Sequence, residues 1–235
     1  MIAATPPVAL TATPAHVALA GAAVQAITVA NPGRTVAVVD ARLAGYALDL
    51  HGRPHVVGQH DRSVVLSIAP QRLALAPGAT GTVLVASTIR LGAGVGDHVG
   101  LVLFTTEPRG GAGVGVRMQV GVPVTIRVPG NVRHRVVFEG TRLVKRVLEL
   151  RFHNTGNVTA TIGARRFRVE LRRSGRVRAT LHVRSRELLP GARSVVDVRL
   201  PQRIHDRVRA MINADDGAGG MLRRQFLVSR RPRDR

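Results

Sequence analysis

One short phrase occurs twice in this chain, and the repetition limits what the chain can fold into more than any other feature. The stretch ANPGRTVAVVD begins at Ala30, and HNTGNVTATIG begins at His153. Each has an asparagine, a glycine two residues later, and then alternating small residues of high β propensity. A second phrase follows each copy, LALAPGATGTVLV in the first half and RELLPGARSVVDVRL in the second. The same order of phrases in both halves predicts two copies of one fold.

The alternation of residues between these phrases indicates which fold is repeated. Runs such as VQAITVA, SVVLSIAP and GTVLVASTIRL are rich in β-branched residues and are bounded by proline and glycine. Strands of this kind, separated by short turns, are typical of a β-sandwich. The best helical candidate, RELLPGARSVV, is interrupted by Pro190 and Gly191. The sequence therefore predicts an all-β fold of two tandem immunoglobulin-like β-sandwich domains.

Charge is distributed unevenly along the chain and indicates where the two domains meet. Residues 1–128 contain 9 arginines and 5 acidic residues, whereas residues 129–235 contain 26 basic and 9 acidic residues. The two parts therefore carry net charges of +4 and +17, which make up the total of +21. The alternation also breaks at the sequence VPGN. We expect one domain at 1–128 and a second, arginine-rich domain at 129–235.

The repeated asparagine and glycine are predicted to form turns between strands. We expect the short amide side chain to cap the turn, and the glycine to adopt a positive φ, which other residues rarely do. A ligand-binding role for the asparagines is the alternative. The predicted turn residues are Asn31, Gly33, Asn154 and Gly156.

Catalytic motifs are not found in the sequence. It has no cysteine, which excludes disulfides, thiolate catalysis and cysteine-bound metals. Nucleophile-elbow, zinc-protease and P-loop patterns are missing, and no helix is expected after the glycines of GAGVGDHVG. We expect a protein that is not an enzyme and has no cofactor. The loop HGRPHVVGQHD is a weak candidate for a metal site, with a solvated loop as the alternative. Its candidate ligands are His51, His55, His60 and Asp61.

The stretch RRFRVELRRSGRVRATLHVRS predicts a β-hairpin around Ser174 and Gly175, with Val177 on the inner side of its second arm. Alternation then places basic side chains on the outward face, where they would attract nucleic acid, an anionic wall polymer or lipid head groups. A solvated surface is the alternative. The scarcity of aromatic residues argues against recognition of single strands by stacking. The candidate binding residues are Arg166, Arg168, Arg172, Arg173, Arg176, Arg178, His182 and Arg184.

The phrases VANPGRT, IAPQRLALAPGATGTVLV, GDHVGLVLFTTEP, VRMQVGVPVTIRVPG and LELRFHNTGNVTATI, in this order, resemble bacterial WxL-interacting proteins. The first domain also resembles the pilus-chaperone-like immunoglobulin fold. The resemblance extends from about Val17 to Val228. It implies an exported protein with a peptidoglycan-binding first domain and a second domain that binds a partner. Members of that family usually carry a leader and a C-terminal membrane helix, and this sequence departs from the family in showing neither. The alternatives are a cytoplasmic protein or a chain trimmed from a longer exported precursor.

The expected function is therefore non-enzymatic binding or scaffolding at the bacterial cell envelope. The expected partner is peptidoglycan, an anionic wall polymer or another surface protein. The alternative is a cytoplasmic protein that binds polyanions such as nucleic acid through the arginine-rich face of its second domain. A metal-dependent enzyme is a third hypothesis, which would require bound metal in the purified protein.

Overall fold

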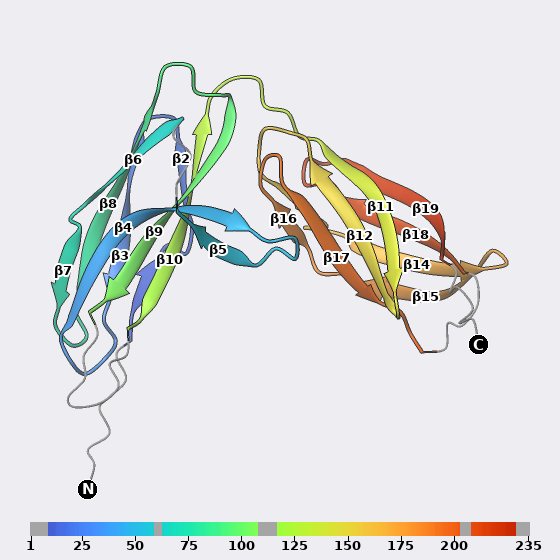
Figure 1. Cartoon of the computed structure of the whole chain (residues 1–235), viewed down its shortest axis with the longest axis horizontal. Coiled ribbons are helices and arrows are strands. Elements are labelled where there is room, and N and C mark those ends of the chain that lie inside the picture. Colours follow the sequence, from blue (N-terminus) through green and yellow to red (C-terminus); the bar gives the residue numbers. More distant parts are fainter. Residues whose placement is uncertain (1–8, 59–62, 108–116, 203–207, 229–235) are drawn as a thin grey trace, which may run out of the picture. The chain divides into compact units, whose positions relative to one another are not determined.

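The computed structural model describes residues 9–58, 63–107, 117–202 and 208–228. All regular elements in these ranges are strands (Figure 1), so the predicted all-β class is confirmed. None of the described elements is a helix with the length and apolar character needed to cross a membrane. The chain forms two compact units, one from residues 1–47 and 55–131 and the other from residues 48–54 and 132–235.

The first unit is a sandwich of two sheets. β2 (Val17–Ala20) and β10 (Gln119–Val128) form a parallel pair, whereas the other pairings with a defined register are antiparallel. One sheet has the order β1 (Thr11–Thr13), β3 (Ala23–Ala30), β8 (Thr80–Ile89) and β6 (Val64–Ala69). The other has the order β2 (Val17–Ala20), β10 (Gln119–Val128), β9 (Gly96–Thr106), β4 (Ala37–Leu48) and β5 (Pro54–Val57), with β7 (Arg72–Leu75) beside β4.

The core of the first unit is built by the alternation of side chains along each strand. Alternate residues of each strand point to the same side of a sheet, so one side of each strand faces the other sheet. Ile27, Val83 and Phe104 lie on those inward sides and are fully buried. Burial of side chains of this size stabilises the fold by about 1.5–3 kcal/mol each.

The second unit contains a three-stranded sheet, a four-stranded sheet and a short ladder. The three-stranded sheet has the order β11 (Val136–Val144), β12 (Val147–Asn154) and β17 (Arg193–Arg199). The four-stranded sheet has the order β15 (Arg176–His182), β14 (Phe167–Arg173), β18 (Val208–Asp215) and β19 (Met221–Val228). The short ladder joins β13 (Ala160–Ile162) to β16 (Arg186–Leu188).

Phenylalanine rings contribute strongly to the core of the second unit. Phe152 is fully buried and lies 5.5 Å from the ring centroid of Phe138 and 6.0 Å from that of Phe167. Phe138 also stacks on Phe226, at 6.1 Å. These contacts connect β11 and β12 to β14 and β19, and so join the two sheets across the core. Aromatic pairs at these separations add about 0.5–1.5 kcal/mol to the energy of burial.

The two phrases of the first repeat, which are far apart in the sequence, meet in the structure. Asn31 is fully buried. Its Nδ2 donates to the carbonyl oxygens of Thr35 at 2.8 Å, Leu75 at 3.0 Å and Ala76 at 3.2 Å. Its Oδ1 accepts from the backbone N–H of Gly33 at 3.1 Å. One amide side chain therefore joins the end of β3 to the turn after β7.

The second repeat makes the same set of hydrogen bonds. Asn154 is also fully buried, and its Nδ2 donates to the carbonyl oxygens of Val158 at 2.8 Å, Leu188 at 3.0 Å and Leu189 at 3.2 Å. Its Oδ1 accepts from the N–H of Gly156 at 3.0 Å. The repeated phrases are thus two parts of one hydrogen-bonded corner, which each unit builds once.

The prediction of positive φ at Gly33 and Gly156 is wrong, because neither has a left-handed backbone. Positive φ occurs instead in the second phrase of each repeat, at Gly78 (72°) and Gly191 (70°). Gly156 is required for space: a Cβ atom there would lie 2.2 Å from the carbonyl oxygen of Arg133. The sequence predicted a turn at each phrase, but it assigned the positive φ to the wrong glycine in each repeat.

Candidate functional site

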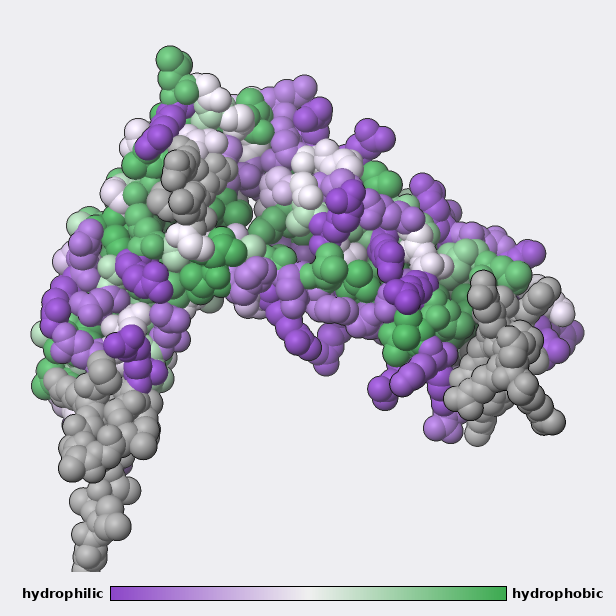
Figure 2. All heavy atoms as spheres, viewed as in Figure 1, coloured by the Kyte–Doolittle hydropathy of each residue, from purple (hydrophilic) through white to green (hydrophobic). Residues whose placement is uncertain are grey.

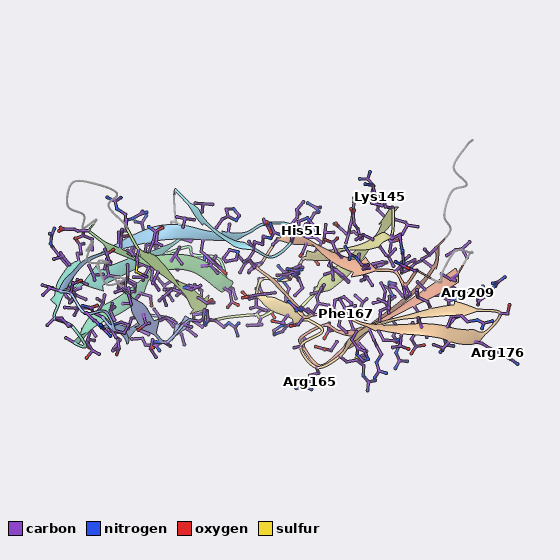
Figure 3. The ribbon with its side chains drawn as sticks, turned by 90° about the horizontal axis from the view of Figure 1, so that it is seen from below. His51, Lys145, Arg165, Phe167, Arg176 and Arg209 are labelled. Carbon is purple, nitrogen blue, oxygen red and sulfur yellow. The ribbon has the colours of Figure 1, made fainter. Side chains whose placement is uncertain are left out.

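The structure contains the predicted hairpin, which consists of β14 and β15. Its turn residues, Ser174 (φ 49°) and Gly175 (φ 78°), both have left-handed backbones. Two consecutive residues of this kind match the twist of the flanking strands, which is why such turns are common in tight hairpins. Figure 3 shows Arg176 at this end of the sheet and Arg165 near the opposite end.

A β-bulge changes which side chains the hairpin presents outward. Leu171 is opposite Ala179, but Arg172 is opposite Val177, so the second arm has one extra residue, Arg178. Directly opposed residues point to the same side of a sheet. Val177 therefore lies beside Arg172 on the outward side and is 48% exposed. The prediction that Val177 faces the inner side is wrong, because simple alternation does not allow for the bulge.

The register of the four-stranded sheet defines an outward surface, which we call the cationic face. It consists of three rows across β15, β14, β18 and β19. Arginines of three strands share this face with one carboxylate, that of Glu170. The rows are Val177–Arg172–Arg209–Leu227, Thr180–Glu170–Met211–Gln225 and His182–Arg168–Asn213–Arg223.

The structure brings only some of the predicted basic residues onto the cationic face. Arg168, Arg172 and His182 lie on it, and Arg173 and Arg176 flank the turn. Arg178 is the bulge residue, and Arg166 and Arg184 lie outside the strands. Two arginines of the face, Arg209 and Arg223, were missed. Alternation within the hairpin carries no information about β18 and β19, which join this sheet only through tertiary pairing.

On the cationic face, Arg172 and Arg209 have hydrogen-bond partners of different charge. Glu170 Oε2 accepts from Arg172 Nη2 at 2.8 Å, and this contact offsets the charge of Arg172. In the amide orientation that satisfies its hydrogen bonds, Gln225 Oε1 accepts from Arg209 Nε at 2.7 Å. That partner is neutral, so it orients Arg209 without offsetting its charge. The face is hollowed beside the turn by about 460 Å³, and Arg172, Arg173 and Arg209 are among the lining residues.

A buried carboxylate fixes the end of the sheet opposite the turn. Asp215 is 7% exposed, and its Oδ2 accepts from the backbone N–H groups of Arg165 and Arg166, each at 2.8 Å. Desolvation raises the pKa of Asp215, but hydrogen bonds from Arg166, Arg165 and Gly217 outweigh it, so the pKa lies below its ordinary value. Arg166 therefore belongs to a structural corner.

The three-stranded sheet of the same unit has a different charge pattern on its outward side, which we call the balanced face. There Glu139 pairs with Arg193 at 3.0 Å and with His153 at 3.2 Å, and Glu149 pairs with Arg151 at 3.5 Å. Carboxylates and basic groups alternate on this surface. The excess of positive charge on the cationic face is therefore a local property of one sheet.

The sheet of the first unit that contains β4, β9 and β10 has a small apolar patch on its outward side. Ala44, Leu101 and Leu103 form a small buried cluster there, with Tyr46 packed against it. Figure 2 shows hydrophobic residues gathered over β4, β9 and β10 on this side. Arg42, directly opposite Leu103, and Asp40 lie on the same side, so the apolar patch covers only part of this sheet.

Among the described residues, only part of the β10 edge opposite β9 is paired. β10 pairs with β9 along its whole length, but β2 covers only Val124–Arg127. Thr106 N–H donates to the carbonyl of Met118 at 3.0 Å, so alternate residues from Met118 onward direct their backbone groups toward β9. The backbone groups of Gln119 and Gly121 therefore point to the open edge. Both residues are exposed.

Proline and half-buried side chains mark the same open edge. By the same alternation, the nitrogen of Pro123 also faces the open side, where a missing N–H breaks no ladder bond. Val120 and Ala12 are half-buried and pack against the core of the first unit. A further strand at this edge would find backbone partners and an apolar surface to cover.

Polar contacts fix the remaining part of β10. Asp97 accepts from Arg127 at 2.6 Å (Nε) and 2.9 Å (Nη2), and this hydrogen bonding raises the pKa of Arg127 above its usual range. On the β2 side, His16 Nε2 lies 2.9 Å from Thr125 Oγ1. These contacts hold the covered half of the strand and leave the edge at Gln119–Gly121 open.

The candidate metal ligands are only partly described. His60 and Asp61 lie outside the described residues. His51 Nδ1 lies 3.3 Å from a carboxylate oxygen of Asp197, and His55 is exposed on β5. Within the described ranges, no three histidine or acidic side chains are grouped so that they could hold a metal ion.

Comparison with known proteins identifies the fold. No family model matches the chain, and no curated protein matches it. Among solved structures, the class 5 fimbriae chaperone CfaA is 12% identical with a TM-score of 0.56, and the match covers 93% of this chain and 98% of that one. CsuC–CsuE, a chaperone–tip subunit pre-assembly complex of Acinetobacter baumannii, gives 14% and 0.52, with coverage of 93% and 97%. The SafB chaperone with SafA pilin from Salmonella enterica gives 13% and 0.51, with coverage of 96% and 98%.

These matches change one expectation and agree with two others. The resemblance to WxL-interacting proteins is not supported, whereas the resemblance to pilus chaperones extends over both units. Pilus chaperones are not enzymes, and the expectation of a non-enzymatic protein agrees with this similarity. The prediction of two immunoglobulin-like domains is confirmed. The chain has the two-domain immunoglobulin-like fold of the periplasmic pilus chaperones.

Proposed function

We propose that this chain is a non-enzymatic, extracytoplasmic binding protein that pairs the open edge of β10 with a strand of a surface subunit. The observation that carries the proposal is the edge at Gln119–Gly121, where backbone groups face away from β9 and the half-buried Val120 packs against the core. The similarity to chaperones whose solved structures contain a tip subunit or a pilin supports a protein partner. The periplasmic location of such chaperones supports a site outside the cytoplasm.

Strand addition would use two kinds of interaction. The N–H and C=O groups of Gln119 and Gly121 would hydrogen bond to the incoming strand and provide affinity that does not depend on sequence. Alternate side chains of that strand would point inward and cover Val120 and Ala12, which are now half-buried. Apolar residues at those alternate positions would be favoured, which gives the site its specificity.

Neighbouring elements limit the position of the added strand. β2 already occupies the edge at Val124–Arg127, and Pro123 offers no N–H group. The incoming strand would therefore pair at and before Gly121. The proposal involves protein recognition, and it does not include specific recognition of peptidoglycan or nucleic acid.

The substitution Gln119→Pro tests the proposal because it removes one outward N–H and leaves the β9 ladder intact. Its matched control is Gln119→Ala, which changes the same side chain and keeps the N–H. Each variant would be titrated by calorimetry with a synthetic peptide in which apolar and polar residues alternate.

We expect Q119A to bind as the native chain does and Q119P to bind about tenfold more weakly, since a hydrogen bond and its strand geometry are lost. Circular dichroism and thermal melting would verify that both variants fold. Equal affinity of folded Q119P and Q119A would show that β10 does not accept a strand at this position.

A further inference from the structure

The cationic face of the second unit combines charge and exposed aliphatic side chains in one row. Arg172 and Arg209 lie directly opposite each other in the middle of the row Val177–Arg172–Arg209–Leu227. Val177 and Leu227, at its two ends, are 48% and 61% exposed. Basic side chains beside exposed apolar ones are also what allows interfacial amphipathic helices to bind anionic membranes.

Arg172 and Arg209 place two positive charges directly opposite each other on neighbouring strands. Like charges directly opposite on neighbouring strands destabilise a sheet. Glu170 offsets only Arg172, and the amide of Gln225 orients Arg209 without a compensating charge. Arg223 adds a further positive charge two rows away. A negatively charged group placed over this row would relieve the repulsion.

The composition of the face favours phosphate groups of a lipid surface over nucleic acid. Proteins that read single strands stack the bases on aromatic side chains. The three rows contain no aromatic ring other than the imidazole of His182. Arginine binds phosphate with a fixed fork of donors. The exposed Val177 and Leu227 would be of no use to a soluble polyanion but would enter the acyl boundary beneath the head groups.

We propose that the cationic face docks on an anionic phospholipid bilayer, with Arg172, Arg209 and Arg223 at the head-group phosphates and with Val177 and Leu227 in the acyl boundary. This surface is separate from the strand edge of β10, and the inference does not rest on the proposed function. The balanced face of the same unit provides the internal comparison, since it carries arginines together with carboxylates.

Vesicle sedimentation tests the charge requirement. The full chain would be mixed with phosphatidylcholine vesicles or with phosphatidylcholine–phosphatidylglycerol vesicles. The double variant R209Q/R223Q removes two charges from the cationic face. Arg142, opposite Glu149, and Arg199, opposite Val147, lie on the balanced face, and R142Q/R199Q removes their two charges. We expect binding only to the anionic vesicles, weakened about 10- to 30-fold by R209Q/R223Q and less than about twofold by R142Q/R199Q.

A second pair of variants separates a bilayer from a soluble anion. V177N/L227N keeps every charge and removes the two exposed aliphatic side chains. We expect it to bind anionic vesicles about five- to tenfold more weakly and to bind inorganic polyphosphate as the native chain does. Thermal melting would verify folding. R209Q should not lower stability, because it removes one of two opposed charges.

Three results would overturn the inference. The first is equal binding to neutral and anionic vesicles. The second is an equal loss of binding for R142Q/R199Q and R209Q/R223Q, which would mean that only net charge matters. The third is unchanged vesicle binding by V177N/L227N, which would assign the face to a soluble polyanion.

Discussion

Asn31 and Asn154 show how a single residue type fixes a corner of each sandwich. Both amides are fully buried, and each joins the end of one strand to a turn formed by a distant segment. The carbonyl oxygens at that turn need donors, while the N–H two residues after the asparagine needs an acceptor. An amide supplies both, whereas a carboxylate supplies only acceptors. The asparagine is therefore explained by the fold, without a ligand.

Replacement of either asparagine by alanine is predicted to be costly and to cost about the same in both units. Each variant, N31A and N154A, leaves buried carbonyl groups without their side-chain donor, which lowers the free energy of unfolding by about 3 kcal/mol. Urea denaturation would measure the loss, and N213A, at a half-buried outward position, is the control. A loss below about 1 kcal/mol in both variants would contradict this explanation.

Asp215 is predicted to make part of the stability depend on acid pH. Its pKa is lowered in the folded chain, so its contribution is fully present above the ordinary value, about 3.9, and is lost as the pH falls through the folded value. The unfolding free energy of the native chain minus that of D215N should therefore shrink as the pH is lowered below about 4. Denaturation at several pH values would measure this difference. A difference that does not vary with pH would refute the role of the carboxylate.

At the scale of elements, the turn that contacts the buried asparagine has the same backbone conformation in both units. Gly78 and Gly191 have φ values of 72° and 70°, and space for a Cβ atom is open at both. In each copy, the glycine N–H donates to the asparagine carbonyl, at 2.8 and 2.9 Å. Backbone conformation alone therefore requires glycine at these two positions, whereas Gly156 is required because its neighbours leave no space.

Alanine substitutions should separate these two requirements. G78A and G191A are each predicted to lower the unfolding free energy by about 1 kcal/mol, the cost of a left-handed backbone for a residue with Cβ. G156A should cost more, because its Cβ would overlap the backbone of Arg133. Thermal melting of the three variants would measure the order. A smaller loss for G156A than for G78A and G191A would show that the close contact at Gly156 relaxes at little cost.

At the scale of the whole molecule, the two units have similar folds but differ strongly in net charge. The second unit has nearly all of the excess positive charge, and its arginines concentrate on one sheet face. Self-repulsion of this kind destabilises a compact state and is screened by salt over roughly 10 Å at 0.1 M. The same charge that fits the second unit for an anionic partner should therefore reduce its stability.

Salt is accordingly predicted to stabilise the second unit more than the first. Raising sodium chloride from about 20 to 200 mM should slow hydrogen exchange in β12 and β18 more than in β3 and β9. Mass spectrometry of peptides from each unit would measure both in one sample. An equal change in the two units would show that the arginines are already balanced within the fold.

Much of the architecture could be predicted from the sequence because it depends on local physics. Period two, the turn residues and the repeated phrases gave an all-β chain with two similar cores. The hairpin around Ser174 was predictable because left-handed turn residues act locally. The bulge at Arg178 was not, since an extra residue in one strand is visible only against its partner. For the same reason, simple alternation predicted the wrong side of the sheet for Val177.

The sequence by itself determined the repeat, the strands and the excess of arginine in the second half. Only the tertiary structure decided that Asn31 and Asn154 each bridge two distant phrases, that Arg209 and Arg223 share a face with Arg172, and that β10 has an open edge. The reason is physical. Alternation and turn preference are properties of neighbouring residues, whereas burial, register and edge pairing depend on segments that only folding brings together.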